Sequence, residues 1–254
     1  MVIKCVLGQI RTESLYEIYT EIMLFRRGRG SLGGIQESLW MYDKESLRKE
    51  SRRMKVYVVR HGDKAEGDYF NEYLKHQDEP LSESGEAKAK MLCTYFKDIS
   101  INQIYTSEYL RTKQTAKYVA ELKHITPIED RRLNEIDNGV IESLSDDEIE
   151  KRYPEFWTDF FSYSKDVRFP DGETGEEVKT RQKELFDDIL KYGQDVLLFS
   201  HEGYIRLLAC HILGIPVYKR NQFKFDFCGI MELYYDAENK LWKIIRLNQI
   251  VEVP

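Results

Sequence analysis

The sequence is short of cysteine and of long apolar runs, and each shortage excludes a class of protein. Its four cysteines, in 254 residues, are scattered without any Cys-x-x-Cys pair. This argues against a disulfide framework and against a cysteine zinc site. The longest strongly apolar runs, such as residues 22–25 and 196–199, are far shorter than the roughly 20 residues that a transmembrane helix needs. We therefore expect a reducing compartment and no membrane span.

Positive charge is also in short supply. The chain has 38 lysine and arginine residues against 44 aspartate and glutamate residues, a net charge of -6, and no long block of one sign. Proteins that bind nucleic acids are usually basic, so we expect no nucleic-acid partner. Charged side chains interrupt the apolar stretch that a signal peptide would require at the N-terminus, so we expect a cytoplasmic protein. The oligomeric state is not predicted.

The first 53 residues differ in composition from the rest of the chain. They carry a balance of +3, against -9 for residues 54–254, and their segment Arg26–Gly34 has four glycines and three arginines in nine residues. Such a segment cannot build a packed element. Since 42% of the whole chain is apolar, enough to bury a core, we expect a poorly structured extension over 1–53 and one domain over 54–254.

The start of translation is a related question. Met54 opens the first strand-like segment, and the codons of Lys49 and Glu50 are purine-rich, as a bacterial ribosome-binding site is. We therefore hypothesise that translation begins at Met54 and that residues 1–53 are not made. An intact mass of the native protein that includes residues before Met54 would contradict this.

From residue 54 onward, short apolar segments alternate with segments of helical periodicity. Strands are predicted at 55–59, 104–106, 126–128 and 195–200, and a C-terminal hairpin at 230–235 and 242–250. Helices are predicted at 83–96, 108–122, 146–153, 155–163, 176–192 and 204–213. This alternation predicts an α/β protein, a three-layer α/β/α sandwich around a mostly parallel central sheet.

Two histidines directly follow the two most convincing strands. His61 lies within Arg60-His61-Gly62, and His201 within Ser200-His201-Glu202-Gly203. Ligands of open α/β sheets bind at the carboxyl ends of the strands. A guanidinium group beside an imidazole, a glycine that lets the backbone approach closely, and the first N–H groups of a helix all favour an anion. The two segments therefore predict a phosphate-binding site.

In this arrangement the sequence resembles the histidine phosphatase superfamily, the phosphoglycerate mutase-like proteins, over about residues 54–235. The motifs that carry the resemblance occur in the family's order: Arg60-His61-Gly62, Pro80-Leu81-Ser82-Glu83-Ser84-Gly85, residues 106–116 with Arg111, Arg132-Leu133-Asn134-Glu135-Ile136 with Gly139, Gly172-Glu173-Thr174, and Ser200-His201-Glu202-Gly203. The occurrence of all these motifs in this order makes the match specific. The resemblance implies a phosphoglycerate mutase-like fold.

The resemblance also implies catalytic roles, which agree with the chemistry of the residues. His61 would attack phosphorus and form a phosphohistidine, and a neutral imidazole is competent for this near pH 7. Arg60, Arg111, His201 and the backbone at Gly62 would bind the phosphoryl oxygens. Glu135 would donate a proton to the leaving oxygen, with Glu142 as the nearest substitute. The scheme requires no metal and no other cofactor.

Some residues depart from the family's pattern. The candidate phosphate-binding asparagine, Asn71, lies ten residues after His61, which is further than the usual motif places it. Lys64 either adds positive charge to the pocket or neutralises Asp63. Glu202 replaces a common glycine, which we expect to affect the shape of the loop more than the chemistry. We expect a minor structural role for Ser107 and structural roles for the other three histidines, at 76, 124 and 211.

The compact middle of the chain favours the phosphatase branch of the family. Glu135 and His201 are only 66 positions apart, whereas mutases carry a longer insertion there. We predict a metal-independent phosphomonoesterase that hydrolyses a small phosphorylated metabolite through a phosphohistidine. Phosphoglycerate mutase-type transfer and a non-catalytic phosphate-binding module remain as alternatives. The aromatic stretch of residues 153–163 either covers the pocket or packs into the core.

Overall fold

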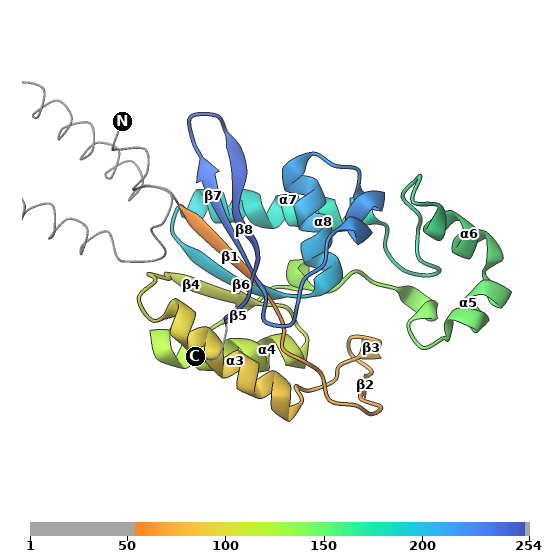
Figure 1. The fold of residues 1–254 in the computed structure, drawn as a ribbon, viewed down its shortest axis with the longest axis horizontal. Coiled ribbons are helices and arrows are strands. Elements are labelled where there is room, and N and C mark those ends of the chain that lie inside the picture. Colours follow the sequence, from red (N-terminus) through yellow and green to blue (C-terminus); the bar gives the residue numbers. More distant parts are fainter. Residues whose placement is uncertain (1–53, 252–254) are drawn as a thin grey trace, which may run out of the picture. The chain divides into compact units, whose positions relative to one another are not determined.

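The computed structural model describes residues 54–251, so the predictions for residues 1–53 lie outside the described residues. A six-stranded sheet forms the centre (Figure 1). Its strand order is β5 (Ile128–Glu129), β4 (Gln103–Thr106), β6 (Val196–Ser200), β1 (Lys55–Arg60), β7 (Ile230–Asp236) and β8 (Leu241–Gln249). The first four strands are parallel, while β7 and β8 are antiparallel additions at one edge. The predicted mostly parallel sheet is confirmed.

Helices cover both faces of this sheet, as Figure 1 shows. The helices α3 (Glu83–Phe96) and α4 (Leu110–Lys123) lie on one face, and α7 (Gly175–Tyr192) and α8 (Glu202–Leu213) lie on the other. Side chains of β1 alternate between the two cores: Tyr57 and Val59 pack toward α3 and α4, and the valines 56 and 58 toward α7 and α8. The predicted three-layer sandwich is therefore confirmed.

Local capping explains where the helices begin and end. The Ser82 hydroxyl accepts from the Gly85 N–H, 3.0 Å away, and α3 spans the predicted residues 83–96. Thr174 and Glu177 form a capping box at the start of α7. Helix α8 starts at Glu202, two residues before the predicted start, because His201 itself occupies the capping position.

Two short helices, α5 (Asp146–Arg152) and α6 (Pro154–Ser162), form the connection between β5 and α7. They break where the sequence predicted, since proline fits the first turn of a helix. In α6, the Phe156 and Phe160 rings lie 5.4 Å and 5.5 Å from the ring of the buried Phe169. These contacts support the core-packing interpretation of the aromatic stretch.

One element was not predicted: a small hairpin of β2 (Phe70–Asn71) and β3 (His76–Gln77), which lies beyond the carboxyl end of β1 (Figure 1). Its turn is closed by the Asn71 side-chain oxygen, which accepts from the backbone N–H groups of Tyr73 and Leu74. Polar two-residue strands carry no hydrophobic alternation, so no sequence pattern predicts them. The remaining turns are 3-10 helices: η2 (Arg131–Leu133), η3 (Gly139–Ile141) and η4 (Val217–Gln222).

Candidate active site

The predicted site residues gather at the carboxyl ends of three neighbouring strands. His61 follows β1, His201 follows β6, and Ser107 follows β4. The ring centroids of the two histidines lie 5.2 Å apart, and the residues are only 4% and 0% exposed. We call the group formed by Arg60, His61, Ser107, Arg111 and His201 the histidine pocket.

The protonation of the His61 ring follows from the hydrogen bond that this ring makes. Its Nδ1 lies 2.7 Å from the Gly62 carbonyl oxygen, and a carbonyl can only accept, so Nδ1 carries the proton. The Nε2 lone pair is thereby left free. Burial, followed by the positive charge of Arg111, lowers the pKa of His61 well below its usual value. His61 is thus a neutral imidazole with Nε2 available as a nucleophile.

His201 is held by Ser107. The Ser107 hydroxyl lies 2.8 Å from His201 Nε2, and the same oxygen accepts from the Tyr109 backbone N–H. Burial and the charge of Arg111 lower the pKa of His201, so its ring is neutral. The Ser107 hydroxyl also lies 2.8 Å from the Thr112 hydroxyl. Among the described residues, the buried Nδ1 of His201 has no partner. Ser107 therefore orients the His201 ring.

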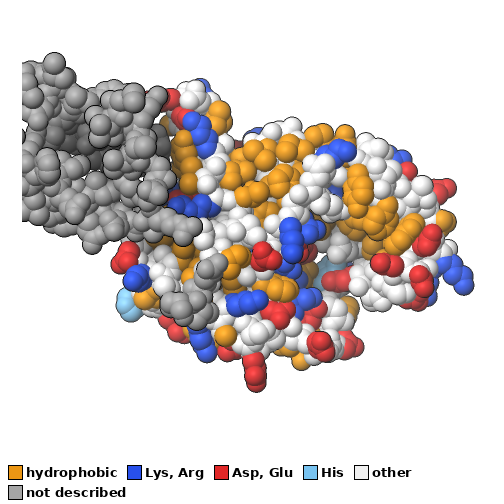
Figure 2. Space-filling view, in the orientation of Figure 1, with side chains coloured by type: hydrophobic (Ala, Val, Ile, Leu, Met, Phe, Trp, Pro, Cys, Tyr) orange, Lys and Arg blue, Asp and Glu red, His pale blue; other side chains and the backbone are white. Residues whose placement is uncertain are grey.

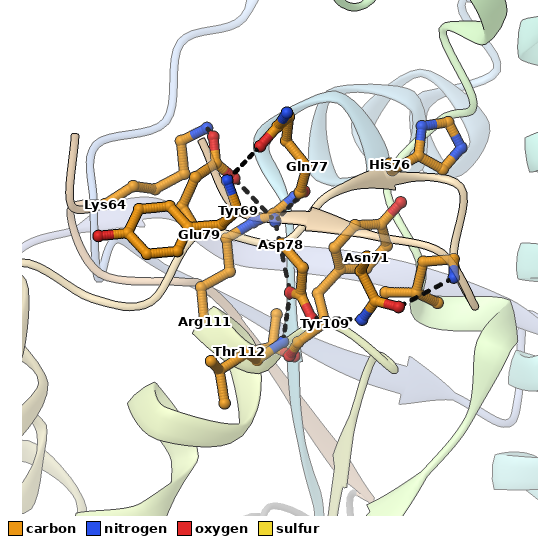
Figure 3. Close-up of polar contacts among 12 residues, drawn as sticks. Lys64, Tyr69, Asn71, His76, Gln77, Asp78, Glu79, Tyr109, Arg111 and Thr112 are labelled. Carbon is orange, nitrogen blue, oxygen red and sulfur yellow. Dashed lines mark hydrogen bonds and ion pairs between the residues drawn. The ribbon is translucent and has the colours of Figure 1, made fainter. Parts of the chain in front are cut away.

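Arg111 lies in the same pocket and meets the segment that follows β3 (Figure 3). Its Nη1 donates to the Gln77 carbonyl oxygen at 3.2 Å, and lies 3.5 Å from a Glu79 oxygen and 4.0 Å from an Asp78 oxygen. Its guanidinium group stacks 4.3 Å from the centre of the Tyr109 ring. Two carboxylates thus compete with any other anion for this arginine.

Arg60 meets a carboxylate as well. Its Nη1 donates to the Phe225 carbonyl oxygen at 2.6 Å and lies 2.9 Å from a Glu202 oxygen. The guanidinium carbon is 4.0 Å from the centre of the Phe227 ring. Glu202 thus also forms an ion pair with Arg60, and the expectation that it affects the shape of its loop more than the chemistry stays a prediction.

Glu135 is fixed against the start of α8. Its carboxylate accepts from the backbone N–H groups of Gly203 at 3.1 Å and Tyr204 at 2.8 Å. A Cβ atom at position 203 would come within 2.7 Å of a Glu135 oxygen, so only glycine allows this approach. We expected these helix N–H groups to face a bound anion, but this carboxylate takes them. Glu135 thereby contacts the first turn of α8, whose capping residue is His201.

The remaining predicted residues have partners within the protein. The Gly62 N–H donates to the Thr115 hydroxyl at 2.9 Å, and the Asn71 amide nitrogen donates to Asp78 at 3.0 Å. Their contacts with phosphate stay predictions. Lys64 lies 2.5 Å from Glu79, the neighbour of Arg111, rather than neutralising Asp63, whose carboxylate accepts from serine hydroxyls at the start of α3.

A cavity of about 600 Å³ opens beside this pocket. Its walls include Tyr109, which contacts the His201 ring at 4.9 Å, and Glu135. We call it the acidic cavity, and its other lining residues are Tyr73, Leu74, His76, Glu108, Arg131, Arg132, Asn134, Asp137, Glu173, Arg181 and Glu184. In Figure 2, histidine atoms are visible in a recess between the α5–α6 lobe and the rest of the domain, with basic and acidic side chains around it.

His76 is a wall residue that the sequence did not single out. Its Nδ1 lies 2.5 Å from a Glu142 oxygen and its Nε2 lies 3.3 Å from an Asp137 oxygen. The hydrogen bond with Glu142 raises the pKa of His76. Glu142, the predicted substitute for Glu135, is thus occupied at the hairpin, and no aromatic residue of the stretch 153–163 lines the cavity.

Two absences hold for residues 54–251. No helix there is both long and apolar enough to cross a membrane, and no three His, Cys, Asp or Glu side chains there gather into a group that could hold a metal ion. The expectations of a metal-free reaction, of no cofactor and of a cytoplasmic location stay predictions.

The chain is similar to a known protein family and to curated relatives. The family described as the histidine phosphatase superfamily (branch 1) matches residues 56–250. A curated relative from Enterobacter sp. (strain 638), named probable phosphoglycerate mutase GpmB, is 30% identical over 184 residues, which are 72% of this chain and 85% of that protein. A protein of the same name from Escherichia coli O1:K1 / APEC is 28% identical, over 74% of this chain and 87% of its own.

Solved structures share the fold. A putative alpha-ribazole-5'-P phosphatase from Escherichia coli K-12 has a TM-score of 0.67 and 21% identity, and covers 79% of this chain and 99% of its own. A mycobacterial glucosyl-3-phosphoglycerate phosphatase has a TM-score of 0.65 and 21% identity, with 78% and 99% covered. At this identity, the likeness establishes the fold.

Proposed function

Since the chain belongs to the histidine phosphatase superfamily, we propose that it is a metal-independent phosphomonoesterase that acts through a phosphohistidine on His61. The observation that carries the proposal is the hydrogen bond from His61 Nδ1 to the Gly62 carbonyl, which leaves Nε2 free. A small phosphorylated metabolite is the proposed substrate. The coarser assignment, to a family of phosphatases and mutases, does not depend on this proposal.

In the first step, His61 Nε2 attacks phosphorus and the bond to the ester oxygen breaks. Arg60, Arg111 and His201 would bind the phosphoryl oxygens, which carry the charge of the transition state. Glu135 in its protonated form would give its proton to the departing oxygen. In the second step, Glu135 as a carboxylate takes a proton from water, the water oxygen attacks phosphorus, and inorganic phosphate leaves His61.

Hydrolysis and mutase chemistry share the first step and differ in the acceptor. The named relatives are probable phosphoglycerate mutases, so a mutase is the second candidate. The short distance in sequence from Glu135 to His201 and the phosphatases among the structural neighbours favour water as the acceptor. The chain retains the proposed nucleophile, both arginines and the proposed proton donor. This set argues against a module that only binds phosphate.

The test compares the full-length protein with His61→Asn and with His124→Asn, a histidine outside the pocket at the end of α4. We expect release of phosphate from 4-nitrophenyl phosphate with excess chelator present, a loss of at least about 10³-fold in His61→Asn, and little change in His124→Asn. Radioactive phosphate should be trapped on the wild-type protein as an acid-labile, base-stable adduct.

Two outcomes would overturn the proposal. A protein that releases no phosphate without added metal is not a metal-independent phosphatase. A protein that interconverts 2- and 3-phosphoglycerate without releasing phosphate is a mutase.

A further inference from the structure

The acidic cavity is the space next to the proposed proton donor. Glu135 forms part of the cavity wall. Tyr109, another wall residue, contacts the His201 ring and so lies between the cavity and the histidine pocket. A phosphoester bound with its phosphoryl group against His61 would place its ester oxygen near Glu135, so the rest of the molecule would extend into this cavity. The chemistry of the walls therefore selects the leaving group, an inference that rests on the proposed function.

The basic groups of the cavity are mostly neutralised by the protein itself. Arg132 lies 2.7 Å from Asp130 and 2.8 Å from Asp188. Arg181 donates to Glu173 at 3.0 Å and also to the carbonyl oxygens of residues 132 and 135. His76 is held by two carboxylates, as described above. Arg131 is exposed at the rim and, within residues 54–251, has no carboxylate partner.

Two carboxylates of the same cavity, those of Glu108 and Glu184, have no such compensation. Glu108 accepts from the Asn134 side chain at 2.7 Å. Glu184 is exposed on α7 and meets no cation within the described part of the chain. Neutral donors satisfy hydrogen bonds to a carboxylate but leave its charge in place. The cavity and its ion-pair partners together carry eight carboxylates, against three guanidinium groups and one imidazole.

This distribution separates two kinds of leaving group. A carboxylate or a second phosphate in the cavity would meet like charges from Glu108 and Glu184, and repulsion between like charges is costly in a partly buried site. Hydroxyl groups can donate to the same oxygens without a charge penalty, and an ammonium group gains attraction. Tyr73, 81% exposed on the hairpin turn, adds an aromatic face to the wall.

We propose that the enzyme is selective for phosphomonoesters whose leaving group is a neutral hydroxyl-bearing molecule or carries an amine, and that it rejects leaving groups with a carboxylate or a second phosphate. The phosphate group itself is bound on the other side of Tyr109, by the arginines of the histidine pocket. Selectivity thus comes from carboxylates that face the leaving group, since the one cavity-wall cation without a carboxylate partner among the described residues is the exposed Arg131.

The test uses three aryl phosphates that differ in one para substituent: hydroxymethyl, carboxylate and aminomethyl. Because the reacting centre and ring are the same, differences in kcat/KM report on the cavity. We expect the full-length protein to prefer the hydroxymethyl ester to the carboxylate ester by about 20-fold. The aminomethyl ester should be hydrolysed at least as well as the hydroxymethyl ester.

Variants assign the effect to residues. The double variant with Glu108→Gln and Glu184→Gln should bring the ratio between the hydroxymethyl and carboxylate esters to within about fivefold. Glu121→Gln, an exposed glutamate on α4 outside the cavity, should leave the ratio as in wild type. The hydroxymethyl ester serves as an internal reference, so a general loss of folded protein does not change the ratio.

Each outcome decides the question. A carboxylate ester hydrolysed as well as the hydroxymethyl ester, or a ratio unmoved in the double variant, overturns the selectivity while the phosphatase proposal stands. If none of the three esters and not even 4-nitrophenyl phosphate releases phosphate, the proposed function itself fails, and the selectivity with it.

Discussion

The histidine pocket and the acidic cavity are neighbours with opposite construction. The pocket is basic, and its histidines and Arg111 are almost completely buried at the ends of sheet strands and the start of α4. The cavity is acidic and open, and the hairpin, loops and α7 build it. Packed elements hold reacting groups in fixed positions, whereas surface segments tolerate variation. Under the proposed function, reaction type and substrate choice are therefore encoded in different parts of this fold.

The arginines of the two regions also differ in what they meet. In the pocket, Arg60 and Arg111 face carboxylates that a phosphoryl group can displace or share. In the cavity, Arg132 and Arg181 are engaged with carboxylates and backbone oxygens that hold loops in place. The pocket is therefore expected to attract an anion more strongly than the cavity, and variants of each region should have separable effects.

The largest effect is expected in the pocket. Arg111→Ala should lower kcat/KM for 4-nitrophenyl phosphate by about 10³-fold, because a guanidinium that binds transition-state oxygens is lost. Arg111→Lys should recover only part of this, since an ammonium group cannot form the paired hydrogen bonds of a guanidinium. Arg152→Ala, a surface variant on α5, serves as control. An equal loss of kcat/KM in Arg111→Ala and Arg152→Ala would contradict a role of Arg111 in binding the phosphoryl group.

The boundary between the regions is tested at Glu135. Glu135→Gln should lower kcat by about 10²- to 10³-fold for an alkyl phosphate, whose leaving oxygen needs a proton, and much less for 4-nitrophenyl phosphate, whose leaving group does not. Glu142→Gln should cause a loss at least about tenfold smaller. If Glu135→Gln leaves kcat for the alkyl phosphate unchanged and Glu142→Gln lowers it, the proton donor is Glu142.

Histidine titration separates the regions by the direction of the pKa shift. Burial and Arg111 lower the pKa of His61 and His201, whereas the hydrogen bond to Glu142 raises the pKa of His76. Imidazole signals followed by NMR should therefore titrate below about pH 6.5 for the first two and above it for the third. Asparagine variants assign the signals. A His61 signal that titrates above pH 6.5 would contradict its description as a neutral nucleophile.

The same shifts affect stability with opposite signs. Between the lowered pKa values and about pH 6.5, the unfolded chain binds more protons at His61 and His201 than the folded one. Their contribution to the free energy of unfolding therefore falls as the pH drops below 6.5, by at most about 1.4 kcal/mol per pH unit for each histidine. The contribution of His76 is present below about pH 6.5 and is lost as the pH rises through its raised pKa. Urea unfolding of His201→Asn should show a smaller acid loss than wild type, and a slope unchanged from wild type would contradict the burial argument.

The smallest effect is expected at Glu202. Removing its charge with Glu202→Gln should strengthen inhibition by inorganic phosphate by about two- to fivefold, because a partly exposed ion pair with Arg60 is worth little. Glu148→Gln, on the exposed face of α5, should leave inhibition unchanged. Weaker inhibition in Glu202→Gln would mean that this carboxylate positions Arg60 rather than competing with phosphate.

The histidine pocket was largely predictable because it depends on strands that end in diagnostic residues. Buried strands such as β1 and β6 show continuous apolar runs, and parallel strands bring their carboxyl ends to one edge. The sequence therefore predicted that His61 and His201 meet. It did not predict the hairpin, because polar two-residue strands have no periodicity, and it missed His76, whose partners lie more than 60 residues away in the chain.

Sequence alone determined the sheet, its covering helices and the candidate residues of the site, since hydrophobic periodicity and capping are local and each motif carries its own residues. Tertiary structure decided the partners of those groups. Glu202 beside Arg60, Glu79 beside Arg111 and the unneutralised Glu108 all result from segments distant in the chain that the fold brings together. Charges act through space over several ångströms, so their balance in the pocket and the cavity exists only after folding.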